Sequence, residues 1–155
     1  MSYVSPSALG TKIIDEGDAK IHMSTRDSVI RAYMAGAILA LSAAFAVTVT
    51  VQTGEPLLGA VLFPVGFCIL YLLGFDLLTG VFTLCPLAVI DRRPGCTWRG
   101  VLRTWGLVFA GNFAGAMTVA VFMAVIVTYG FSAAPDAVGQ KLGHIGEART
   151  LGYAA

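Results

Sequence analysis

Three long apolar stretches, separated by short polar ones, set the pattern of this sequence. They run from Ala32 to Val51, from Leu57 to Val89 and from Val101 to Tyr129. A helix that crosses a membrane needs about 20 predominantly apolar residues, and each stretch is long enough. The pattern therefore predicts an all-α membrane protein. Its expected spans are residues 27–52, 57–90 and 101–130.

The second stretch predicts a helix that is broken within the membrane. It is too long for one straight span and too short for two spans with a loop between them. We expect the backbone to leave helical geometry between Ile69 and Asp76, and a second helical piece to begin by Thr79. Gly74 should lie in the break. Asp76 should be the N-cap of the second piece, because a carboxylate accepts hydrogen bonds from the free N–H groups of a first turn.

An ionisable residue at membrane depth is costly, so Asp76 is also a candidate functional residue. Irregular backbone survives at that depth only where it is buried in protein or lines a wet cavity. The break therefore suggests a pore or a substrate pathway. The alternative is one long, tilted and kinked helix in which Asp76 pairs with a neighbouring residue.

The segment before the first span predicts a short helix. Ser5 is a suitable N-cap and Pro6 a suitable first residue. Residues 1–24 then alternate apolar and charged positions, which indicates an amphipathic segment on the cytoplasmic side, interrupted near Gly17. The helix either lies on the membrane surface or is docked on the rest of the protein.

Small residues at a spacing of four predict closely packed helices. Gly111 and Gly115 form one such pair in the third span. Asn112 lies between them and needs a hydrogen-bond partner at depth, either the unwound backbone of the broken span or a carbonyl of a neighbouring helix. In the first span the small residues are Ala32, Gly36, Ala40 and Ala44.

Composition supports the membrane class and excludes several functions. The chain is 57% hydrophobic and 12% charged, and that charged fraction is about half the average of soluble proteins. The net charge of +1, without a basic patch, gives no indication of nucleic-acid binding. An enzyme is disfavoured because no nucleophile–base pair is recognisable. The sequence also predicts no disulfide framework, metal site or cofactor, and we interpret His22 and His144 as surface residues.

Lys and Arg residues predict the orientation of the chain. With three crossings, the N-terminus and the loop between the second and third spans share one side, which holds eight of the ten basic residues. The positive-inside rule then places the N-terminus in the cytoplasm. We expect a multi-pass protein of the cell inner (plasma) membrane.

Two segments resemble the formate/nitrite transporter family. Phe75–Gly80 is similar to the acidic-Leu-Phe-Thr-Gly segment of that family's broken second helix. Trp105–Ala116, which contains Gly-Asn-Phe-Ala-Gly, is similar to its third-helix motif. Pro6 and the segment Gly17–Lys20 also fit. The motifs occur in the family's order and together cover nearly the whole chain.

The resemblance implies an aquaporin-like inverted-repeat fold in a homopentamer, with one pore per subunit in the lipid bilayer. It implies passage of small monovalent anions such as formate, nitrite or hydrosulfide, with proton coupling. Phe63 and Phe67 would contribute to constrictions, and Leu78 and Thr79 would line the pore. Leu78 stands where many members have Phe. Without the resemblance, Phe63 and Phe67 would be interpreted as helix-packing residues.

The resemblance covers only the first of the family's two three-span repeats. No residue here matches the family's central pore histidine, since His144 lies outside the spans. We therefore expect residues 1–155 to be the N-terminal repeat: a fragment, a truncated gene product or a half that needs the missing C-terminal half as its partner. The alternative is a non-transporting three-helix membrane assembly protein. The sequence leaves open which anion is moved, and whether by a channel or a secondary transporter.

Overall fold

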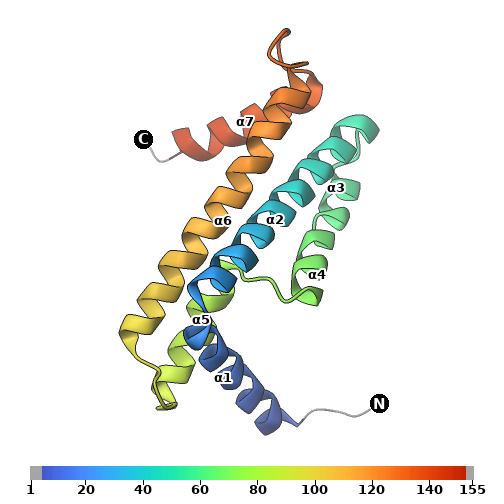
Figure 1. Cartoon of the computed structure of the whole chain (residues 1–155). Coiled ribbons are helices and arrows are strands. Elements are labelled where there is room, and N and C mark those ends of the chain that lie inside the picture. Colours follow the sequence, from blue (N-terminus) through green and yellow to red (C-terminus); the bar gives the residue numbers. More distant parts are fainter. Residues whose placement is uncertain (1–4, 153–155) are drawn as a thin grey trace. The chain divides into compact units, whose positions relative to one another are not determined.

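A computed structural model of the chain describes residues 5–152, and within this range the chain is helical without a strand. The prediction of an all-α protein is confirmed. The predicted segment 1–24 is described from residue 5, and the last three residues of the predicted repeat 1–155 lie outside the described range. The helices are α1 (Pro6–His22), α2 (Thr25–Thr53), α3 (Pro56–Leu62), α4 (Val65–Leu72), α5 (Leu78–Ile90), α6 (Trp98–Val127) and α7 (Ala137–Leu151) (Figure 1).

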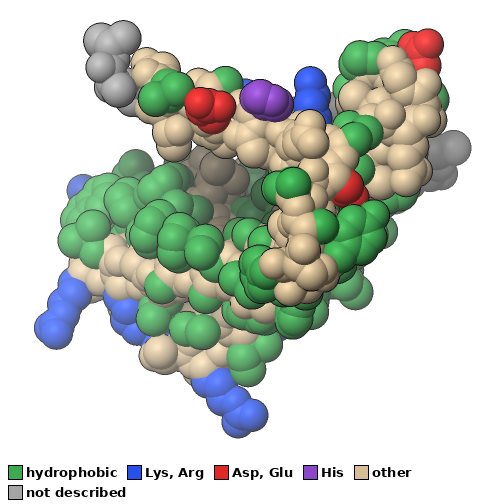
Figure 2. All heavy atoms as spheres, turned by 90° about the horizontal axis from the view of Figure 1, so that it is seen from above, with side chains coloured by type: hydrophobic (Ala, Val, Ile, Leu, Met, Phe, Trp, Pro, Cys, Tyr) green, Lys and Arg blue, Asp and Glu red, His purple; other side chains and the backbone are tan. Residues whose placement is uncertain are grey.

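Helices α2 and α6 are long and apolar enough to cross a membrane. Only 28% of the most apolar window of α2 and 22% of that of α6 is buried within the chain, whereas the core helix of a soluble protein would be mostly buried. Hydrophobic side chains accordingly cover much of the visible face in Figure 2. Such exposed apolar surface fits contact with lipid or with further protein.

The chain forms two compact units. The first comprises Met1–Gly36 and Gly74–Ala114, and the second comprises Ala37–Leu73 and Gly115–Ala155. Helices α1 and α5 therefore belong to the first unit, and α3, α4 and α7 to the second. Each of the two long helices, α2 and α6, contributes one part to each unit.

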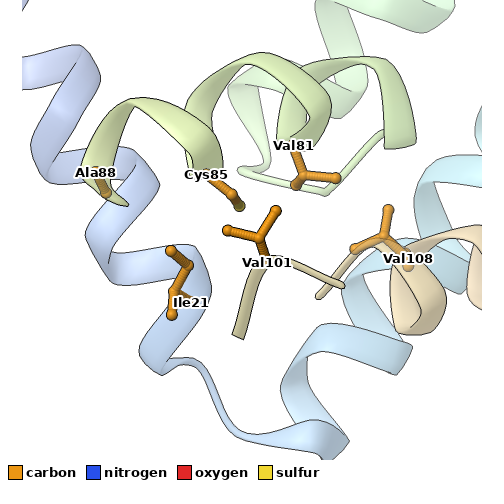
Figure 3. Packing of buried hydrophobic residues seen from close by; sticks show 7 residues of the cluster. Ile21, Val81, Cys85, Ala88, Val101 and Val108 are labelled. Carbon is orange, nitrogen blue, oxygen red and sulfur yellow. The ribbon is translucent and has the colours of Figure 1, made fainter. Parts of the chain in front are cut away.

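The core of the first unit is built where α1 packs on α5. Figure 3 shows the apolar side chains that converge there from α1, α5 and α6. The side chains labelled in it are Ile21, Val81, Cys85, Ala88, Val101 and Val108.

Gly17 of α1 is buried, and a β-carbon at this position would overlap the carbonyl oxygen of Leu84. The expected interruption near Gly17 is wrong: α1 is continuous, and the glycine allows close docking instead.

The start of α1 follows the prediction. The Ser5 hydroxyl accepts a hydrogen bond from the N–H of Ala8 at 3.2 Å, and Pro6 occupies the first helical position. A Ser at the N-cap satisfies one of the free donors of the first turn, and Pro lacks the N–H that would otherwise be unsatisfied. Docking of α1 on α5 corresponds to the second of the two alternatives for this helix.

Small residues bring α2 and α6 together within the first unit. A β-carbon on Gly36 would overlap the backbone carbonyl of Asn112, and one on Gly111 would lie 2.5 Å from the β-carbon of Ala32. These two glycines therefore allow backbone-to-backbone approach of the helices, as the spacing of small residues predicted. Gly115 is also buried, in the second unit.

The second unit contains another interruption, between α3 and α4. Pro64 lacks the N–H of a helical hydrogen bond, and the helix ends before it. Ser42 of α2 provides hydrogen-bond partners for the backbone there. Its hydroxyl donates to the Phe63 carbonyl at 2.6 Å and accepts from the Gly66 N–H at 3.1 Å. The predicted span 57–90 is therefore divided into three helical pieces, one more than expected.

The end of α6 was also only partly predicted. The chain leaves helical geometry through three consecutive left-handed residues, Tyr129, Gly130 and Phe131. It then forms α7, whose N-cap is Asp136, with its carboxylate accepting from the Gly139 N–H at 2.8 Å. The polar composition after Tyr129 gave no indication of this last helix.

Gly17→Ala should loosen the docking of α1. The added methyl group meets a backbone carbonyl, which cannot move as a flexible side chain would, and overpacking typically costs about 1–3 kcal/mol. We expect a lower midpoint of thermal unfolding in detergent. Gly10→Ala on the same helix is the control, because its β-carbon meets open space and Ala is favoured over Gly in helices by up to about 1 kcal/mol. Equal effects of the two substitutions would contradict the close packing at Gly17.

Candidate functional site

The backbone between Leu72 and Leu78 leaves helical geometry, which confirms the predicted break and excludes the continuous kinked helix. Gly74 has φ +69, a left-handed conformation that glycine adopts without steric cost. Asp76 and Leu77 are buried, with 4% and 8% of their surface exposed. The break therefore begins at the exposed residues Leu73 and Gly74 and becomes buried at Asp76 and Leu77.

Asp76 does not cap α5, so that part of the prediction is wrong. The N-cap is Leu77, which makes no side-chain capping bond. The Asp76 carboxylate instead forms an ion pair with Nζ of Lys20 on α1, at 2.5 Å, and both side chains are shielded from solvent, with 3% and 12% exposed. A buried carboxylate without a cation would carry a large desolvation cost, and pairing with Lys20 takes precedence over capping.

Asn112 of α6 takes over the capping role. Its Oδ1 accepts from the N–H of Leu78, the first residue of α5, at 2.9 Å. Its Nδ2 donates to the carbonyls of Asp76 and Ala32, each at 2.8 Å. Both alternatives for this side chain are thus correct together: it binds unwound backbone and also a carbonyl of a neighbouring helix.

Two more side chains bind backbone carbonyls around the break. Nη1 of Arg31 donates to the Gly74 carbonyl at 3.2 Å. Nε1 of Trp105 donates to the Val81 carbonyl at 3.0 Å, and its ring packs edge-to-face on Phe82 with centroids 4.6 Å apart. Side chains of α1, α2 and α6 therefore hold the start of α5 in place.

The electrostatics of this region favour an anion over a cation. The N-terminus of α5 carries the positive end of a helix dipole. Two cationic side chains, Lys20 and Arg31, contact the break, against one carboxylate, Asp76. Lys20 balances that carboxylate, so the dipole and the more exposed Arg31 remain as positive contributions.

The predicted pore residues fall in different units. Leu78 is half-buried and Thr79 is exposed, and both lie in the first turn of α5 in the first unit. Phe63 and Phe67 belong to the second unit, where their rings contact each other edge-to-face with centroids 5.6 Å apart. Their roles in lining a pore stay predictions.

The sequence reasoning missed the partners Lys20, Arg31 and Ser42. A usable signal existed for the first two, because a buried carboxylate requires a cation and both of these basic residues precede the first apolar stretch. No comparable signal marked Ser42, since a single Ser in an apolar helix commonly bonds to its own backbone.

A helix break held by neighbouring helices, in a chain whose long apolar helices are largely exposed, is typical of membrane transporters and channels. Comparison with known proteins specifies the family. The profile described as "Formate/nitrite transporter" matches residues 7–152. The chain belongs to the formate/nitrite transporter family, whose members are transporters and channels rather than enzymes.

Individual relatives agree with this assignment. The chain is 33% identical over 106 residues to a "Probable formate transporter" of Methanothermobacter thermautotrophicus, covering 63% of this chain and 38% of that protein. It is 27% identical over 128 residues to a "Formate channel BtFdhC" of Bacillus thuringiensis, covering 77% of this chain and 48% of that protein. An "Uncharacterized transporter YrhG" of Bacillus subtilis is 26% identical over 133 residues, covering 82% of this chain and 49% of that protein. The matched part thus spans less than half of each relative's length.

Removal of either member of the Lys20–Asp76 pair should destabilise the protein strongly. Breaking a buried ion pair leaves an uncompensated charge and costs on the order of 3–5 kcal/mol, so Lys20→Met and Asp76→Leu should each lower the unfolding midpoint. The double variant should recover most of the loss, since no buried charge remains. Lys12→Met, on an exposed lysine of the same helix, is the control. Additive losses in the double variant would show that the pair is not the reason for either effect.

Asn112→Ala should destabilise the start of α5. It leaves one N–H and two carbonyls without the partner they have now, and each unsatisfied buried polar group costs about 1–3 kcal/mol. Hydrogen exchange of the Leu78 amide, followed by mass spectrometry, should become faster. Phe113→Ala on the neighbouring exposed side chain should not change it. Unchanged protection of Leu78 in Asn112→Ala would contradict the capping role.

Proposed function

We propose that this protein forms part of a membrane pathway for small monovalent anions such as formate or nitrite. The observation that carries the proposal is the ordered break before α5 in a chain that belongs to the formate/nitrite transporter family. Relatives named as a formate transporter and a formate channel support an anion of this size.

The pathway would use the start of α5 to attract the anion. The helix dipole and Arg31 favour a negative charge, and the pairing of Asp76 with Lys20 prevents that carboxylate from repelling it. Leu78 would form an apolar constriction that a hydrated anion crosses poorly. A proton taken up near the constriction would allow passage as the neutral acid, which is the proposed proton coupling. Thr79 offers a hydroxyl beside this constriction.

A complete pathway would need more protein than these residues provide. The chain spans less than half of each relative, and its long helices keep most of their apolar windows exposed. We propose that segments equivalent to the rest of the relatives, together with further copies in a pentamer, complete an aquaporin-like pore. The proposed setting is the inner membrane, with the N-terminus in the cytoplasm.

Residues 1–155 alone should not conduct formate or nitrite, whereas addition of a family C-terminal half, fused or co-expressed, should restore uptake. One repeat offers one wall of a pore, and each polar backbone group left facing lipid costs several kcal/mol. Uptake into vesicles should be compared at matched protein levels. Robust uptake by residues 1–155 alone would contradict the need for a second half. Correct assembly without uptake in either form would favour the non-transporting assembly protein.

In the conducting form, Leu78→Trp should reduce formate uptake more than about tenfold by narrowing the constriction, equivalent to about 1.4 kcal/mol on the barrier. Leu57→Trp, on a largely exposed leucine of α3, serves as the control for the added bulk. Both variants should be checked for equal amounts in the membrane. Unimpaired uptake by Leu78→Trp would remove Leu78 from the proposed pore lining.

A further inference from the structure

We propose that Asp18, His22 and Cys96 form a binding site for a divalent metal ion of the zinc class. Asp18 and His22 lie on α1, and Cys96 lies in the connection between α5 and α6. One ligand atom from each residue lies within 4.8 Å of the other two. The three residues belong to the first unit and are separate from the helix break.

The carboxylate of Asp18 already gathers the other two ligand atoms. Asp18 and His22 are four residues apart, so both side chains project from one face of α1. Nδ1 of His22 lies 2.8 Å from Oδ1 of Asp18, and Sγ of Cys96 donates to the same oxygen at 3.1 Å. A nitrogen, an oxygen and a sulfur therefore lie together, and one metal ion would take the place of their present contacts.

A tight turn brings Cys96 to α1. The Cys96 N–H donates to the Arg93 carbonyl at 3.1 Å, and Gly95 has φ +77. Pro94 at the second position and glycine at the third are typical of a type II turn. A β-carbon on Gly95 would lie 2.7 Å from Nε2 of His22. Glycine is therefore needed both for the turn and for its approach to the imidazole ring.

The ligand set selects the kind of metal. A thiolate, an imidazole and a carboxylate are the ligands that Zn²⁺ uses, and three protein ligands leave a fourth position for water. Mg²⁺ and Ca²⁺ prefer oxygen ligands alone. The side chains of Asp18 and His22 are 35% and 51% exposed, so an ion can reach the site from solvent.

Protons and nearby charges set the conditions for binding. Partial burial, together with the hydrogen bond to Asp18 and its negative charge, raises the pKa of the Cys96 thiol to about 11. The metal would bind the thiolate, so binding would release the thiol proton. Arg93 is the cation nearest in the turn, and Asp15 and Asp91 pair with it at 2.8 and 2.9 Å, which balances its charge.

The metal would link α1 to the connection between α5 and α6. This link would hold α1 in the docked position in which Lys20, two residues after Asp18, reaches Asp76. The site does not depend on the proposed transport function, because its ligands and its test involve no anion.

Cobalt provides the direct test, because a thiolate–Co²⁺ bond gives a charge-transfer absorption band. The purified, assembled membrane protein in detergent should develop this band on titration with Co²⁺, and Zn²⁺ should abolish it. Cys96→Ser should lose the band, whereas Cys68→Ser, on an exposed cysteine of the second unit, should retain it. Absence of the band in the unaltered protein, or its persistence in Cys96→Ser, would overturn the proposal.

Histidine variants test the second ligand. His22→Asn should weaken cobalt affinity by more than about tenfold, since even outer-shell partners of a metal site contribute 10- to 100-fold. His144→Asn, on the exposed histidine of α7, is the matched control and should leave affinity unchanged. Equal affinity of His22→Asn and the unaltered protein would exclude His22 as a ligand.

Alkylation of the unaltered protein keeps the proposal testable if a variant fails to fold. Zn²⁺ should slow the reaction of Cys96 with a maleimide, measured by mass spectrometry of the peptide. The reaction of Cys68 in the same sample should not change. Equal rates for Cys96 with and without Zn²⁺ would refute metal ligation by its sulfur.

Discussion

The ordered break before α5 depends on one constraint: unwound backbone in an apolar setting must find hydrogen-bond partners within the protein. Asn112 supplies them for the Leu78 N–H and the Asp76 carbonyl, and Arg31 supplies one for the Gly74 carbonyl. These partners come from α6 and α2, so the break can form only where those helices are already packed beside it.

Close helix packing is therefore part of the site. Gly36 and Gly111 let α2 and α6 approach until Asn112 can reach both the carbonyl of Ala32 and the break. Gly17 does the same for α1 against α5, and Lys20, one turn of α1 further on, then reaches the buried carboxylate of Asp76. A larger residue at any of these glycines would destabilise the break indirectly, because it would separate the helices that support it.

Local signals in the sequence predicted the local features. The length of the second apolar stretch and Gly74 located the break, and Ser5–Pro6 located the start of α1, because glycine, proline and N-cap residues act on their own stretch of backbone. The partner of Asp76 could not be predicted in this way, since Lys20 is distant in sequence and several cations were available. The interruption at Pro64 also depends on a distant residue, because Ser42 satisfies the backbone there. Helix α7 was missed although its cap is local: the Asp136 carboxylate accepts from the N–H of Gly139, three residues further on.

The failure of Asp76 as a cap has a chemical explanation. A break exposes N–H groups at the start of one helix and carbonyls on the segment before it, and an ionised carboxylate can only accept. An amide both donates and accepts, so Asn112 can serve the two kinds of group at once without adding a charge. Asp76 is then free to pair with Lys20. Since this pairing neutralises the carboxylate, the positive end of the α5 dipole is not cancelled by the acidic residue beside it.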